Sequence, residues 1–271
     1  SGLTFGKSGN TRTITHETNA ITVNGPVDFY GGAVAVNANM TTTNASTGDV
    51  SFSTSGLTGS GNLVLASGRE LTVTQSGSST YSGVISGTDA TLTKEGAGTL
   101  TLSGNNTFTG STAISAGTLK NGVTGVLYDS SAVTVSSGAT WDINGYAETV
   151  GSIAGAGNIL LGGAALTAGG DNSSTTFSGV ISETGGLTKL GTGAFTLSGS
   201  NTFTGNVDIN GGTLNLDSTG RLFVVSTSIW DAHGTVTVGS NATLKMYDFS
   251  ASTGSLGYLS YDYYNLVING G

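Results

Sequence analysis

Two stretches of this chain decide its fold: LTKEGAGTLTLSGNNTFTGSTAISAGTL at residues 92–119 and LTKLGTGAFTLSGSNTFTGNVDINGGTL at residues 187–214. They carry lysine, glycine, asparagine and phenylalanine at the same places. The likeness continues upstream, where GSGNLVL at residues 59–65 matches GAGNILL at residues 155–161. Self-similarity over a long period is typical of chains built from stacked structural units. We therefore expect two diverged copies of one long module, at residues 56–145 and 152–247.

Inside the module, polar and apolar residues alternate in runs of three to five residues, as in Thr99–Leu102 and Thr235–Val238. Each run ends at glycine, asparagine or serine, which is the pattern of short strands separated by turns. No window has the apolar spacing of a helix. Asn-Gly pairs follow a β-branched residue at four places, which suits either a hairpin or the corner of a solenoid: Val23–Gly25, Ile143–Gly145, Ile209–Gly211 and Ile268–Gly270.

Two all-β architectures compete, a sandwich array and a parallel β-helix. Aromatic residues make up only 7% of the chain and the single proline, Pro26, lies beside a turn. Sandwiches use longer strands and large core aromatics, and strands stacked on both edges cannot spare an N–H group. We therefore predict a parallel β-helix with coils of about 20–25 residues, about a dozen in all. The residues predicted to point inward are Leu100, Leu102, Phe108, Ile114, Leu119, Phe195, Leu197, Phe203, Ile209 and Leu214.

The composition of the chain argues against several classes of function. Charged residues are 9% of the chain, where about 25% is typical. The net charge is −8 and the eight Lys and Arg residues do not cluster, which argues against binding to nucleic acid or to an anionic membrane surface. No apolar run is long enough for a membrane helix, so no membrane insertion is expected. Cysteine is absent, which removes disulfides and thiolate metal sites.

The repeated pattern L-x-K-x-G-x-G-x-x-x-L-S-G-x-N-x-F-x-G resembles the passenger-associated transport repeat of bacterial autotransporters. Its first copy consists of Lys94, Gly96, Gly98, Leu102, Gly104, Asn106, Phe108 and Gly110. Its second copy consists of Lys189, Gly191, Gly193, Leu197, Gly199, Asn201, Phe203 and Gly205. The stretches Ile21–Pro26 and Val34–Asn37 resemble coils of filamentous-haemagglutinin-type adhesins. These resemblances imply a right-handed parallel β-helix in a secreted protein on the bacterial cell surface.

From pattern and resemblance together we expect one continuous β-solenoid rod over residues 1–271, with adhesin-like coils at 1–55 and a tyrosine-rich segment at 248–271. The expected role is a stiff stalk or fibre unit for adhesion, cell–cell contact or biofilm, not an enzyme. The expected partners are neighbouring solenoid modules, further copies of the chain, or a glycan or other cell-surface ligand. Two alternatives stay open: a carbohydrate-active β-helix of the lyase or tailspike kind, and a subunit of a homopolymeric matrix fibre.

Residues that could carry chemistry are few and scattered. The nearest carboxylate grouping is Asp208 with Asp217, and Asp262 lies alone among tyrosines. Hydrolysis of a glycosidic bond needs two carboxyl groups facing the bond. The histidines are His16 and His233; Asp231 and His233 could form an acid–base pair on one strand face, but surface turns explain both histidines better. No cofactor or metal site is predicted, and isolated calcium sites on carbonyl groups and Asp stay open.

Four tyrosines near the C-terminal end are the one candidate ligand site. Tyr258, Tyr261, Tyr263 and Tyr264 fall within seven residues. Exposed aromatic rings stack on sugars or pack at interfaces, and they also cap the ends of rods. We expect capping or packing rather than ligand contact.

Overall fold

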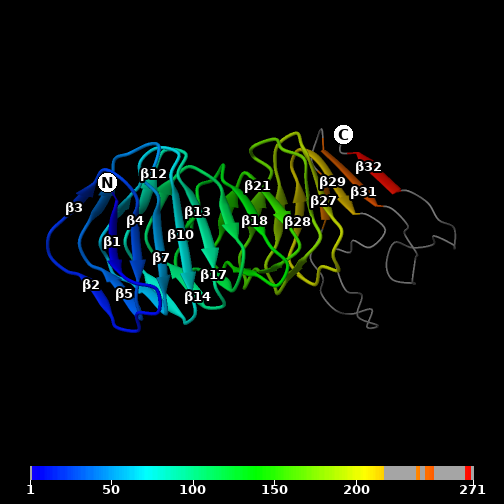
Figure 1. Cartoon of the computed structure of the whole chain (residues 1–271). Coiled ribbons are helices and arrows are strands. Elements are labelled where there is room, and N and C mark those ends of the chain that lie inside the picture. Colours follow the sequence, from blue (N-terminus) through cyan, green and yellow to red (C-terminus); the bar gives the residue numbers. More distant parts are fainter. Residues whose placement is uncertain (1, 217–235, 239–241, 247–265, 270–271) are drawn as a thin grey trace.

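The computed structural model describes residues 2–216, 236–238, 242–246 and 266–269, with only the backbone given for the last three stretches. The described chain is all β, and its strands stack in parallel along a rod with the N-terminus at one end (Figure 1). The predicted β-solenoid is thus confirmed, while its right-handedness stays a prediction. No helix among the described residues could cross a bilayer.

Each coil of the rod has up to three strands. The first strand of every coil belongs to one continuous sheet, which we call the first face. This face holds thirteen strands in sequence order. They are β1 (Leu3–Gly6), β4 (Val27–Tyr30), β7 (Val50–Thr54), β10 (Glu70–Gln75), β13 (Thr91–Glu95), β16 (Thr112–Ile114), β18 (Ala132–Val135), β21 (Ser152–Gly155), β24 (Thr175–Phe177), β27 (Ala194–Leu197), β29 (Gly212–Leu216), β31 (Ala242–Met246) and β32 (Leu266–Asn269).

The second face consists of a three-stranded and a six-stranded sheet, joined by an isolated bridge between Gly59 and Tyr81. Its strands are β2 (Ile14–His16), β5 (Ala33–Val36), β8 (Gly56–Thr58), β11 (Ser79–Tyr81), β14 (Thr99–Leu102), β17 (Thr118–Asn121), β19 (Thr140–Asp142), β22 (Asn158–Leu160) and β25 (Val180–Ser182).

The third face is interrupted. Its first sheet has β3 (Ile21–Val23), β6 (Met40–Thr42), β9 (Leu63–Val64), β12 (Ile85–Gly87) and β15 (Thr107–Phe108). Its second sheet has β20 (Glu148–Val150), β23 (Leu166–Ala168), β26 (Leu187–Lys189), β28 (Val207–Ile209) and β30 (Val236–Val238). Between the two sheets lies loop 122–131, which connects β17 to β18 without a strand on this face.

The register of the first face sets the coil length. Phe195 pairs with Leu214 and Leu3 pairs with Val27, so one coil takes 19 to 24 residues along this part of the chain. Side chains alternate between the two sides of a strand, which places Leu71 and Val73 inside and Thr72 outside. The alternation read from the sequence therefore becomes a column of apolar residues along the rod axis.

The interior is closely packed, and all ten residues predicted to point inward are buried, with at most 2% of each exposed. Near the N-terminal end the rings of Phe5, Phe29 and Phe52 stack in successive coils with centroids 4.6 and 4.8 Å apart. The interior is not made of aliphatic residues alone, since Trp141 is also fully buried. Its indole Nε1 donates a hydrogen bond to Asn121 Oδ1 at 3.1 Å, and this satisfies its one polar group.

The two copies of the repeat occupy different faces of the rod. Lys94 of the first copy lies in β13 on the first face, whereas its equivalent Lys189 is the last residue of β26 on the third face. The equivalent residues are 95 positions apart. That spacing is not a whole number of coils, so the second copy is turned by one face about the axis.

The last strand pair of the first face is antiparallel, unlike the first pair. Strand β32 pairs antiparallel with β31, with Leu244 opposite Ile268, whereas the other strand pairs among the described residues are parallel. The predicted division of residues 1–271 into 1–55, 56–145, 152–247 and 248–271 stays a prediction.

Candidate functional site

The lysine of each repeat lies inside a corner of the rod. Lys94 is fully buried, and its Nζ donates to the carbonyl oxygens of Glu95 at 2.6 Å, Gly96 at 2.9 Å and Ala116 at 3.2 Å. Since Ala116 belongs to the next coil, one ammonium group links two coils.

Lys189 repeats this arrangement in the second copy. Its Nζ donates to the carbonyl oxygens of Leu190, Gly191 and Gly211, with Gly191 at 3.2 Å and Gly211 at 3.4 Å. Gly211 again comes from the next coil. The same three-carbonyl cage therefore forms on two different faces of the rod, which identifies it as a property of the repeat.

Burial changes the acidity of both lysines. It lowers the pKa of Lys94 to about 8 from an ordinary value of 10.5, against the smaller opposite effect of the Glu95 carboxylate. Burial also lowers the pKa of Lys189, with Asp171 acting in the opposite direction. Three acceptors around each Nζ match the three donors of an ammonium group, so the charged form of Lys94 present at neutral pH has its donors satisfied.

The asparagine of each repeat is a second link between coils. Asn106 Oδ1 accepts the backbone N–H of Ile85 at 2.9 Å in the preceding coil, and Asn106 Nδ2 donates to the carbonyl of Val126 at 3.1 Å in the following coil. In the second copy Asn201 Oδ1 accepts the N–H of Ile181 at 2.9 Å. One buried amide thus satisfies backbone groups that the interrupted strand ladder leaves without partners.

The glycines of the repeat allow the corners of successive coils to touch. A Cβ atom at Gly104 would overlap the carbonyl oxygen of Gly83 one coil back, and a Cβ at Gly199 would overlap that of Gly179. Any side chain here would push the coils apart. The lysine, asparagine and phenylalanine of both copies are buried in the rod, and so are Gly104 and Gly199.

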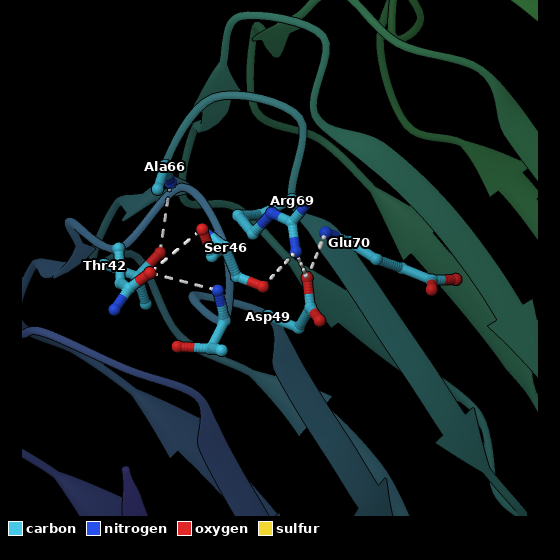
Figure 2. A network of polar contacts seen from close by, with 8 residues as sticks. Thr42, Ser46, Asp49, Ala66, Arg69 and Glu70 are labelled. Atoms are coloured by element: carbon cyan, nitrogen blue, oxygen red, sulfur yellow. Dashed lines mark hydrogen bonds and ion pairs between the residues drawn. The ribbon is translucent and has the colours of Figure 1, made fainter. Parts of the chain in front are cut away.

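Polar side chains also link coils at a corner near the N-terminal end, between β6 and β10 (Figure 2). Arg69 Nη1 donates to the carbonyl of Ser46 at 2.9 Å and lies 3.6 Å from Asp49 Oδ1. The same Asp49 oxygen accepts the backbone N–H of Glu70 at 2.9 Å. This cluster holds one surface loop onto the next coil.

Because about half of the Asp49 side chain is exposed, we expect Asp49→Ala to lower the free energy of unfolding by only about 1 kcal/mol. Urea unfolding followed by circular dichroism measures it. A loss above about 2 kcal/mol would show that this corner contributes as much as the buried lysines.

A buried carboxylate in the following coil holds loop 122–131, the loop that interrupts the third face. Glu148 is 2% exposed and accepts the backbone N–H groups of Val126 and Leu127, both at 3.0 Å. It also accepts Asn121 Nδ2 at 2.5 Å. The sequence analysis missed this residue, because its partners lie 21 to 27 positions earlier in the chain and no local motif links them.

The environment of Glu148 makes it titrate near neutrality. Burial raises the pKa of Glu148 to about 7, more than its hydrogen bonds from Leu127, Val126 and Asn121 lower it, and the Asp129 charge adds a further increase. The folded chain binds the proton of the Glu148 carboxyl group more tightly than the unfolded chain does. The stability gained from this protonation is therefore fully present below pH 4.5. It disappears as the pH rises through 7.

We therefore expect the free energy of unfolding to fall between pH 4.5 and 7.5 by up to about 3 kcal/mol more in the native chain than in Glu148→Gln. Urea titrations of both proteins at the two pH values give the difference. An equal change in both proteins would mean that Glu148 does not titrate in this range.

Two tyrosines are exposed in this region, Tyr128 in the anchored loop and Tyr146 in the turn before β20. Tyr128 is 42% exposed and Tyr146 is 37% exposed, and they are the only tyrosines among the exposed large side chains of the described residues. They lie on neighbouring loops, since the N–H of Gly125 donates to the carbonyl of Ala147 at 3.3 Å. We call loop 122–131 and the turn at 144–146 the tyrosine loops.

The residues singled out in the sequence are dispersed. His16 is at the N-terminal end, where its Nε2 donates to Asn19 O at 2.8 Å beside a 230 Å³ cavity lined by Phe5, Ile14 and Phe29. Asp208 is half-buried on β28. Outside the described residues lie Asp217, Asp231, His233, Asp262, Tyr258, Tyr261, Tyr263 and Tyr264. Within the part of the chain that the structure describes, no three His, Cys, Asp or Glu side chains are grouped to hold a metal ion.

Comparison with known proteins agrees with the residues described above. The passenger-associated-transport-repeat family matches residues 92–120 and 187–216, so the chain carries two of these repeats. A curated relative, the adhesin BmaC autotransporter of Brucella suis biovar 1 (strain 1330), is 39% identical over 87 residues. The match covers 32% of this chain and 2% of that protein. No solved structure matches the chain.

Proposed function

We propose that this chain is a stiff stalk segment of a secreted bacterial adhesin, that it lies on the cell surface, and that it acts mechanically and not as an enzyme. The observation that carries the proposal is the placement of the repeat residues. Lys94, Asn106 and their equivalents in the second copy all connect one coil to another inside the rod. Since the characteristic residues of the repeat bond to neighbouring coils, their placement supports a mechanical role for the rod.

Stiffness follows from the way the contacts are distributed. The parallel ladder of the first face runs from β1 through β31, so bending requires many backbone hydrogen bonds to stretch together. The two lysine cages lie on different faces because the copies are turned relative to each other. The rod is therefore cross-linked in more than one direction, which favours a rigid spacer over a hinge.

The surface location is supported by the relative. The matched protein is an adhesin and an autotransporter by name, and this chain spans a small fraction of its length. The acidic, weakly charged composition is compatible with a solvent-exposed rod. We infer that the chain is one segment of a much longer surface protein.

Labelling of intact cells tests the location. An antibody raised against the purified chain should bind unpermeabilised cells of the producing bacterium, and external protease should remove the signal. Binding that requires permeabilised cells would overturn the proposed surface location.

A further inference from the structure

We propose that the tyrosine loops form a binding site for a neutral saccharide, with Tyr128 and Tyr146 as its stacking surfaces. A stalk needs no ligand site, so this inference goes beyond the proposed function and can fail without affecting it.

The tyrosine loops lie where the third face of the rod is interrupted. In the part of the third face that precedes the loop, the outward row has no aromatic residue; it consists of Thr22, Thr41, Val64, Ser86 and Thr107. At loop 122–131 the third face loses its strand and presents an aromatic ring. Interruptions of a regular scaffold are where binding residues concentrate, because a loop can vary while the scaffold positions it.

Loop 122–131 is anchored by an energetically costly group, the buried carboxylate of Glu148. Burying the Glu148 carboxylate is unfavourable, and its raised pKa of about 7 shows that the environment resists the charge. Yet the group fixes the backbone of Val126 and Leu127, directly before Tyr128. A neutral anchor could hold a purely structural loop. A costly group beneath exposed aromatic residues fits a site that requires defined geometry.

Side chains from three successive coils hold the loop and its anchor. Asn121 donates to Glu148 and accepts from Trp141 Nε1, so the carboxylate is part of a buried polar network. Asn106 of the first repeat donates to the carbonyl of Val126 in the same loop. The repeat thus supports the loop directly, which gives Tyr128 a rigid base.

The exposed side chains of the tyrosine loops indicate the kind of ligand they fit. An exposed tyrosine offers an apolar ring face and a hydroxyl group, which suits a pyranose ring with C–H groups on one face and hydroxyls at its edge. Exposed Asp129 and Ser130 follow Tyr128 and offer hydrogen-bonding groups to sugar hydroxyls. A carboxylate at this place, in a chain of net charge −8, disfavours anionic sugars and nucleic acids. Two rings also present too little area for a stable protein interface, which needs about 800 Å² on each partner.

Calorimetric titration of the purified chain tests the site, with chitohexaose, cellohexaose and maltohexaose as neutral probes and a hyaluronan hexasaccharide as the acidic probe. We expect at least one neutral probe to bind with a Kd of about 1 mM or below, and the acidic probe not to bind. Tyr128→Ala and Tyr146→Ala should each weaken binding at least about tenfold, the effect of losing about 1.4 kcal/mol. Tyr30→Ala, on the outward side of β4, is the matched control and should bind normally.

Circular dichroism and thermal melting establish that each variant folds, and Tyr128→Phe, which keeps the ring, should retain binding within about threefold. The proposal is overturned if no neutral probe binds at 10 mM, if the alanine variants bind like the native chain, or if the acidic probe binds as well as the neutral ones. Loss of binding in folded Tyr30→Ala would also contradict it, because the site would then lie on another face.

Discussion

Replacing Lys94 with methionine is expected to lower the free energy of unfolding by about 3 kcal/mol, and Lys189→Met should have a similar effect. Methionine fills a comparable volume but cannot donate hydrogen bonds. Three carbonyl groups in each corner would lose the ammonium donor, and the contact to the next coil at Ala116 or Gly211 would be lost with it. Urea unfolding followed by circular dichroism gives the overall change, and amide hydrogen exchange shows whether opening is local to the coils that the lysine joins.

Lys120→Met is the matched control. Lys120 lies on the outer side of β17, and its Nζ is 2.7 Å from Asp142 Oδ2. A third of its side chain is exposed, so loss of this ion pair should cost no more than about 1 kcal/mol. Equal losses in Lys94→Met and Lys120→Met would contradict the assignment of the buried lysines as links between coils.

Asn106→Ala should destabilise the rod by about 2–3 kcal/mol, and Asn201→Ala by a comparable amount. The substitution leaves the N–H of Ile85 and the carbonyl of Val126 buried without their partner. Because Asn106 also supports loop 122–131, hydrogen exchange at Val126 and Leu127 should accelerate in this variant. Chemical denaturation and exchange measured by mass spectrometry test the two effects together.

The adjacent Asn105 provides the control, since it is exposed. Asn105→Ala should change stability by less than about 0.5 kcal/mol. If Asn105→Ala and Asn106→Ala behave alike, the buried amide is not a link between coils.

The sequence predicted the fold because a solenoid repeats its pattern along the chain. Alternation in Thr99–Leu102 placed Leu100 and Leu102 inside, and the glycines between runs marked the corners. The repeat also identified Lys94 and Asn106 as notable positions. Their roles as links could not be predicted, because each also bonds to an atom about 20 residues away and the register between coils is needed to find that partner.

The interruption of the third face could not be predicted from the sequence, again because it depends on a partner in another coil. Loop 122–131 has apolar residues, Val126 and Leu127, that read like a short strand. Their N–H groups instead bond to Glu148, a carboxylate that local alternation treats as an ordinary polar residue. The tyrosines singled out in the sequence lie outside the described residues. Tyr128 and Tyr146 stand apart in the chain, and only the register between coils shows that their loops are neighbours, joined by the hydrogen bond from Gly125 to Ala147.

The orientation of the two repeats shows how coil length controls surface display. Equivalent residues 95 positions apart fall on different faces because β26 lies four coils and two further faces after β13. Each copy nevertheless keeps its lysine cage and its buried asparagine. Stacking and display are therefore separable in this architecture.

Exchange of this segment within the producing bacterium tests the central claim, that it serves as a stiff spacer, most directly. One strain replaces it with an unrelated β-solenoid having the same number of coils, and another replaces it with a flexible Gly-Ser linker of the same number of residues. The readout is antibody access to an epitope placed beyond the segment, on intact cells. We predict that the solenoid preserves access and the linker reduces it; equal access with the linker would contradict a role that depends on stiffness.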